Sequence, residues 1–245
     1  MLIAAAVCPH PPLLVPAALG AAAARPPGDL RKVSAAAAAA VQGLLAAAPD
    51  LVVVVGGGPA DREYGPDTAG SLRDFGVPVI VGTGEAVLPL SLTVGRWLLE
   101  SAEVRGPAAL PGRPAVLLQS VNQRTAPTDC RTMGMLLADR ASRVAMLAMG
   151  DGTARRARDE PGAHDPAAQE YDEDVAEALA AADDHWLGRL DPARDDEMMV
   201  AGRAAWQVMA GAAAGRRLHG RLLCMTAPYG VTYFVATWGE AAVTA

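Results

Sequence analysis

Short, continuous apolar runs separated by longer helical segments constrain this 245-residue chain more than any other feature. The run Leu-Val-Val-Val-Val at 51–55 is apolar at every position, not at every second one. Such a run is typical of a central strand that is buried on both faces. The alternation of runs and helical segments predicts an α/β fold with a mainly parallel central sheet and helices on both faces.

The same pattern places the individual elements along the chain. The expected strands are 2–7, 51–55, 77–81, 115–121, 144–149, 222–225 and 231–237. The expected helices are 33–48, 88–102, 127–138, 168–182 and 192–214. Neither an internal repeat nor a linker divides the chain, so residues 1–245 are expected to form one domain.

Charge, hydropathy and cysteine spacing argue against several classes of partner and of protein. The net charge is −6, which gives no electrostatic reason to expect nucleic acid or an anionic membrane as partner. No run reaches the roughly 18 apolar residues of a membrane span, and the apolar start lacks the basic region of a signal peptide. The three cysteines form no CxxC pair, which argues against a disulfide framework or a zinc ribbon. We therefore expect a cytoplasmic protein.

Polar loops follow three of the expected strands. They are CPHPPLLVP at 8–16, GGGPADREYGP at 56–66 and GDGTARRARDEPGAHDP at 150–166. In open α/β sheets the ligand usually binds beyond the carboxyl ends of the strands, so the three loops should converge on one rim. In the first loop, prolines on both sides of His10 hold its imidazole on a stiff, non-helical turn.

The third loop offers further candidates for a substrate-facing site. Asp151, Thr153 and Arg155 follow the strand directly, and His164 is a second imidazole a few residues on. The alternative to a substrate-facing site is that this loop is a polar turn whose arginines point into solvent. The glycine triplet of the second loop lacks GxGxxG spacing, and neither GxSxG nor HExxH occurs. Glu197, in the helical segment DDEMMVAG, is either a solvated first-turn carboxylate or an inward-facing metal ligand.

Five stretches occur in a particular order, namely CPHPPLLVP, VVVVGGGP, LSLTVGRWLL, AMGDGTARR and APYGVTYFVATW. This ordered set resembles the LigB superfamily, which contains class III extradiol dioxygenases and the Memo-like proteins, over nearly the whole chain. The resemblance implies a LigB-like fold, a small aromatic ligand and a homodimer. In active members, two histidines and a glutamate hold Fe(II), which leaves positions for a catecholate and O₂, and another histidine is the acid/base group.

The resemblance assigns the metal positions one at a time. His10, in its HPP context, matches the first metal histidine. Glu197 matches the glutamate, with Asp195 and Asp196 as alternatives. The position of the second metal histidine falls on Gly57, which has no side-chain donor.

The acid/base histidine falls on Ala154. The expected pocket residues are His10, Gly57, Asp151, Thr153, Ala154, Arg155 and Tyr229.

Two functions follow from this degenerate site. In the first, a divergent dioxygenase-like oxidoreductase holds Fe(II) or another divalent cation. Asp61 or Glu63 then replaces the missing ligand in a site that suits Mn²⁺, and His164 serves as base. In the second, a catalytically inactive relative without a metal binds a small molecule or a protein partner in the retained pocket. Ordinary catechol cleavage is not expected in either case.

Overall fold

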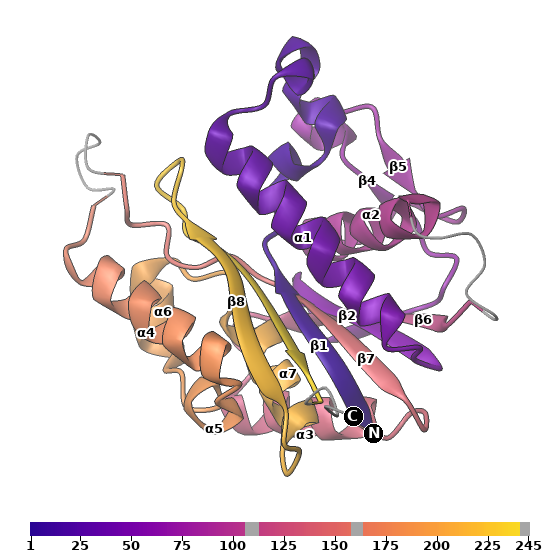
Figure 1. Ribbon diagram of the computed structural model, residues 1–245, viewed down its shortest axis with the longest axis vertical. Helices are drawn as coiled ribbons and strands as arrows, with labels where there is room; N and C mark the ends of the chain where they lie inside the picture. The colour runs from indigo at the N-terminus through magenta and orange to yellow at the C-terminus, as the bar shows by residue number, and fades with distance from the viewer. Residues whose placement is uncertain (106–112, 158–163, 241–245) are drawn as a thin grey trace, which may run out of the picture.

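A seven-stranded sheet forms the centre of the molecule, in the order β3-β6-β2-β7-β1-β9-β8 (Figure 1). The computed structural model describes residues 1–105, 113–157 and 164–240. The strands are β1 (Leu2–Cys8), β2 (Leu51–Gly58), β3 (Arg62–Tyr64), β6 (Ala115–Asn122), β7 (Val144–Met149), β8 (His219–Thr226) and β9 (Tyr233–Gly239). The four central strands β6, β2, β7 and β1 are parallel, whereas β3, β9 and β8 pair antiparallel with their neighbours.

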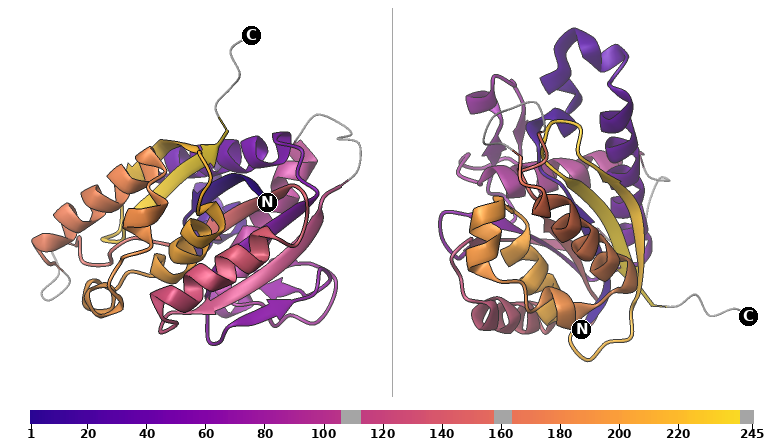
Figure 2. Two further views of the ribbon diagram at one scale, coloured as in Figure 1. Left: turned by 90° about the horizontal axis from the view of Figure 1, so that it is seen from below. Right: turned by 90° about the vertical axis from the view of Figure 1, so that its left-hand side faces the viewer.

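Helices cover both faces of this sheet (Figure 2). One face carries α1 (Gly28–Ala46) and α2 (Leu90–Arg105). The other carries α3 (Pro127–Ala138), α4 (Ala167–Ala181), α5 (Asp184–Leu187), α6 (Pro192–Met198) and α7 (Arg203–Ala213). The predicted single-domain α/β fold with a mainly parallel central sheet is therefore confirmed.

The buried strands divide their side chains between two apolar clusters because successive residues of a strand point to opposite faces. Val53 and Val55 of β2 belong to the cluster under α3 and α7, and Val52 and Val54 belong to the cluster under α1 and α2. All four valines are fully buried. The continuous apolar run therefore has the central position that its composition predicted.

The structure corrects three details of the predicted elements. The glycine triplet 56–58 is the end of β2, not a loop, and it pairs with Ser120 to Asn122 of β6. Glycine is needed there because a Cβ at Gly56 would lie 2.5 Å from the Ser91 hydroxyl.

The expected strand 77–81 is reduced to β5 (Ile80–Val81), which pairs with β4 (Gly70–Ser71) outside the main sheet. The expected helix 192–214 is two helices, because Met199 adopts a left-handed backbone with φ of 55° between them. The sequence also did not predict the 3-10 helices η1 (Pro12–Leu14), η2 (Pro16–Ala24) and η3 (Arg73–Phe75). Within the described residues, no helix has both the length and the apolar character to span a membrane.

Candidate functional site

The loops that follow β1 and β7 are joined at the carboxyl edge of the sheet. The backbone N–H of His10 donates to Asp151 Oδ1 at 2.9 Å. The His10 Nδ1 atom lies 3.7 Å from the same carboxylate oxygen, and both side chains are largely buried. Because β7 lies between β1 and β2, the end of the glycine triplet is close to this pair. The predicted convergence of strand ends thus brings His10, Asp151 and Gly57 into one region.

A cleft of about 460 Å³ opens at this edge. Its walls come from the loop after β1, the end of β2, the loop after β6, and the turn between α6 and α7. The lining residues are His10, Gly57, Gly58, Gln123, Asp195, Asp196, Met199, Val200 and Ala201. Gln123 fixes the turn, because its amide Nε2 donates to the Val200 carbonyl at 2.6 Å.

Gly57 has more room for a side chain than its neighbours in the triplet. A Cβ at position 57 would meet its nearest neighbour, the Ala201 carbonyl oxygen, at an ordinary distance of 3.7 Å. A Cβ at Gly58 would instead come within 2.6 Å of Ser120 Cβ. The backbone of Gly57 is held by the Ser91 hydroxyl, which donates to its carbonyl at 2.6 Å. Position 57 therefore has space for a ligand side chain but carries none.

The carboxylates of α6 differ sharply in their surroundings. Asp195 is fully buried. Its Oδ1 accepts the hydroxyl of Tyr171, and its Oδ2 lies 3.6 Å from Arg203 Nε. Burial raises the pKa of Asp195 to about 6, although the Tyr171 hydrogen bond and the Arg203 charge act in the opposite direction.

Asp196 and Glu197 are both exposed. Asp196 lines the cleft, but Glu197 does not. The Glu197 backbone carbonyl accepts a hydrogen bond from Arg155 Nε at 3.2 Å. Of the three acidic positions considered for the family glutamate, the structure thus brings Asp195 and Asp196, not Glu197, to the His10 cleft.

The GDGTARR stretch organises the neighbouring backbone. Thr153 is fully buried, and its hydroxyl and N–H donate to the carboxylate of Asp172 at 2.7 and 3.1 Å. Thr232 and Arg156 also donate to Asp172, at 2.6 and 3.2 Å. The Ala154 N–H donates to the carbonyl of Met198 at 3.1 Å, which ties this stretch to α6. Asp172 thus organises the loop, a role that the sequence did not predict because nothing in its own segment marks it.

Of the predicted site residues, Asp151, Thr153, Ala154, Arg155 and Glu197 do not line the cleft, and four more also lie outside its lining. The Asp61 carboxylate accepts the Asn122 N–H at 2.6 Å and the hydroxyl of Thr125 at 2.8 Å. Glu63 lies on the edge strand β3 and forms an ion pair with Arg140 at 2.7 Å. His164 and Tyr229 are exposed.

The residues at this edge do not fit a two-histidine, one-carboxylate iron site. His10 supplies an imidazole, Gly57 supplies nothing, and Asp195 is already bonded to Tyr171 and paired with Arg203. Over residues 1–105, 113–157 and 164–240, no three histidine, cysteine or acidic side chains form a group that could hold a metal ion. A facial triad needs three such donors on one side of the metal.

Comparisons with known proteins bear on the fold. No family model matches the chain, and no curated protein matches it. Among solved structures, the chain is similar to the crystal structure of an uncharacterized protein from Escherichia coli K12, with a TM-score of 0.57. The two share 14% sequence identity, and the match covers 97% of this chain and 100% of the other. At this identity the likeness identifies a shared α/β fold over the whole chain.

Proposed function

We propose that this chain is a catalytically inactive, LigB-like relative of class III extradiol dioxygenases whose strand-end cleft binds a small aromatic molecule. The observation that carries the proposal is that the Asp195 carboxylate of α6 is already bonded to other side chains. Asp195 is buried against Tyr171 and Arg203, beside a cleft in which position 57 has no donor. A carboxylate already engaged in this way is a poor ligand for a cation, because metal binding needs a deprotonated, available oxygen.

The chemistry of the lining supports a ligand of particular polarity. Met199, Val200 and Ala201 supply apolar surface, and His10 and Gln123 supply polar groups. Asp196 supplies an exposed carboxylate at the cleft, and no lysine or arginine belongs to the lining within the described residues. Opposite charges attract in such partly buried sites, so a neutral or cationic ring should bind better than an anionic one.

Three phenols of similar size test this ligand class. We expect catechol and the cationic phenol tyramine to bind in calorimetric titrations, and 4-hydroxybenzoate to bind about tenfold more weakly. His10→Ala should weaken binding of the first two while leaving the far-UV circular dichroism spectrum unchanged. If none of the three binds at millimolar concentration, the proposal is wrong.

The alternative is a metal-dependent oxidoreductase that uses Fe(II) or Mn²⁺. It needs donors beside His10, and the two substitutes expected from the sequence, Asp61 and Glu63, are bonded elsewhere. Anaerobic titration with Fe(II) and with Mn²⁺ separates the two functions. Uptake at micromolar concentration, or oxygen consumption with catechol that His10→Ala abolishes, would favour the oxidoreductase.

Gly57→His is the informative variant for this alternative. The free space beside Ala201 admits a side chain at position 57, so the variant should gain Fe(II) affinity by about tenfold or more over the wild type. Gly57→Leu fills the same space without a donor and is the matched control.

A cytoplasmic location and a homodimeric assembly also belong to the proposal. Cell fractionation tests the location, and analytical sedimentation tests the assembly.

A further inference from the structure

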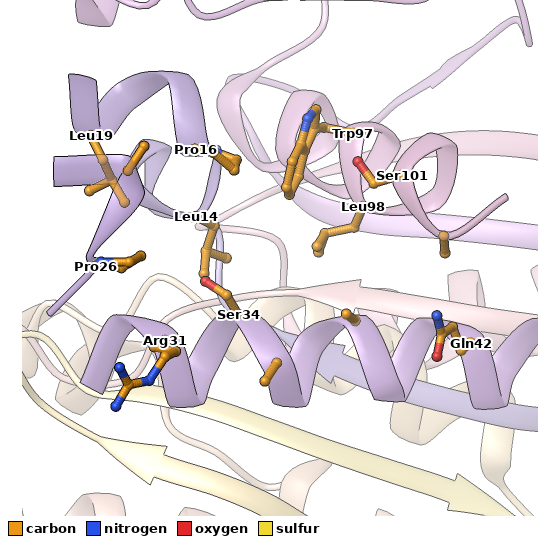
Figure 3. Close-up of a pocket in the computed structure, with 14 residues that line it drawn as sticks. Leu14, Pro16, Leu19, Pro26, Arg31, Ser34, Gln42, Trp97, Leu98 and Ser101 are labelled. Atoms are coloured by element: carbon orange, nitrogen blue, oxygen red, sulfur yellow. The ribbon is translucent and has the colours of Figure 1, made fainter. Parts of the chain in front are cut away.

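A second cavity, a groove of about 280 Å³, lies between η2, α1 and α2 (Figure 3). Leu14 and Leu19 face it from the segment after β1, and Trp97 and Leu98 face it from α2. None of its lining residues belongs to the His10 cleft. The two cavities are therefore separate sites.

Small side chains leave this groove open. The lining residues of α1 recur at positions 31, 34, 35, 38 and 42, which is the spacing of one helix face. Ala35 and Ala38 each present only a methyl group to the groove. On the opposite wall, none of the residues of η2 is buried, so its apolar side chains are partly open to water. Covering such apolar surface with a ligand is favourable.

One end of the groove carries a positive charge. Arg31 is the one charged side chain of the lining, and in the described part of the chain its guanidinium makes no hydrogen bond or ion pair. The adjacent cation, Lys32, is paired with Asp29 at 3.2 Å and does not line the groove. The lining runs along α1 from Arg31 to Gln42, which corresponds to about 16 Å at the rise of an α-helix.

We propose that this groove binds a medium-chain aliphatic carboxylate. The alkyl chain lies along Trp97 and Leu98 over the alanines of α1, and the carboxylate meets Arg31. The groove is long and apolar, it has a cation at one end that no described residue pairs with, and no described acidic residue lines it. It therefore matches a linear amphipathic anion in shape and in charge. The proposal stands on this groove alone and does not depend on the ligand of the His10 cleft.

Decanoate is the probe, and decylammonium is its control of opposite charge. Titration of the full chain is followed by the indole N–H signal of Trp97 in ¹H–¹⁵N spectra, assigned by its loss in Trp97→Phe. We expect a saturable shift with decanoate and none with decylammonium at equal concentration. The absence of a saturable shift up to the solubility limit of decanoate would overturn the proposal, and equal binding of both probes would do the same.

Two matched pairs of variants locate the ligand. Arg31→Gln should weaken decanoate binding about fivefold, whereas Lys32→Gln, which removes the same charge one residue on, should not. Ala38→Leu fills the groove and should abolish binding, whereas Ala39→Leu, about 100° further round the helix, should not. Equal effects within either pair would contradict the proposed position.

Discussion

Asp195 is the residue whose surroundings most constrain the chemistry at the carboxyl edge of the sheet. It is fully buried, accepts the Tyr171 hydroxyl, and lies 3.6 Å from Arg203 Nε. Arg203 is itself fully buried, and its Nη1 donates to the Thr125 carbonyl and to Gln207, each at 2.9 Å. The carboxylate is therefore part of a buried polar network, and removing one member would leave a buried polar atom of its neighbour without that partner.

Asp195 should make the stability of the protein depend on pH. Its folded-state pKa, about 6, lies above the ordinary value of 3.8, so folding takes up a proton between these pH values. The contribution of Asp195 is therefore fully present below pH 3.8 and is lost as the pH rises through 6. Between pH 5 and pH 7 the loss should be about 1 kcal/mol.

Asp195→Asn keeps the shape of the side chain but cannot titrate. Urea unfolding of both proteins at pH 5 and pH 7 gives the free energy of unfolding in each case. We expect the difference between wild type and variant to favour the wild type more at pH 5 than at pH 7. A difference that is the same at both pH values would show that Asp195 is ionised over this range.

At the scale of single elements, the crossing of α3 and α7 depends on two glycines. A Cβ at Gly134 of α3 would lie 1.9 Å from the Val208 carbonyl oxygen, and one at Gly211 of α7 would lie 2.3 Å from the Arg131 carbonyl oxygen. Both obstacles are backbone atoms of the facing helix, so they cannot rotate away. The absence of a side chain thus sets the distance between these two helices.

Gly134→Ala should therefore destabilise the fold, by about 3 kcal/mol, because the two helices must move apart. Gly43→Ala is the matched control, since Gly43 lies inside α1 and a Cβ at that position would have no neighbour within 4 Å. There the substitution should stabilise the protein by up to about 1 kcal/mol through helix propensity. Thermal unfolding of both variants checks the prediction, and similar midpoints for the two would contradict it.

The sequence predicted some elements well and others poorly, for physical reasons. The expected bounds of β7 and α3 agree with the structure, because β7 is uniformly apolar and α3 begins at a proline in its first turn. The break between α6 and α7 was missed. It lies at Met199, whose left-handed backbone with φ of 55° ends α6 although the segment reads as one continuous helical pattern.

The candidate site was predicted in the same uneven way. The positions of His10 and Gly57 follow from strand ends, and parallel strands bring their carboxyl ends together. The partners of Asp172 and Asp195 could not be predicted, because they come from separate elements and depend on how α4, α6 and α7 pack. Periodicity shows which face of an element is apolar, but it does not show which buried polar groups meet.

At the scale of the whole molecule, the central strands connect the two apolar clusters. Val53 contributes to the cluster that contains Trp206, and Val54, the next residue, contributes to the cluster against which Trp97 packs. If β2 separated from one cluster during unfolding, its residues in the other cluster would also become exposed. The two faces of the sheet should therefore unfold together, although they are covered by different helices and carry the two proposed sites.

Val53→Ala and Val54→Ala test this coupling. Each removes two methyl groups from a fully buried side chain and should cost about 2 kcal/mol. Because β2 belongs to both clusters, either variant should shift one shared unfolding transition. Trp206→Phe and Trp97→Phe backgrounds identify which indole reports on which face in fluorescence-detected urea unfolding. If Val53→Ala lowered the midpoint reported by Trp206 but left that of Trp97 in place, the two faces would be independent folding units.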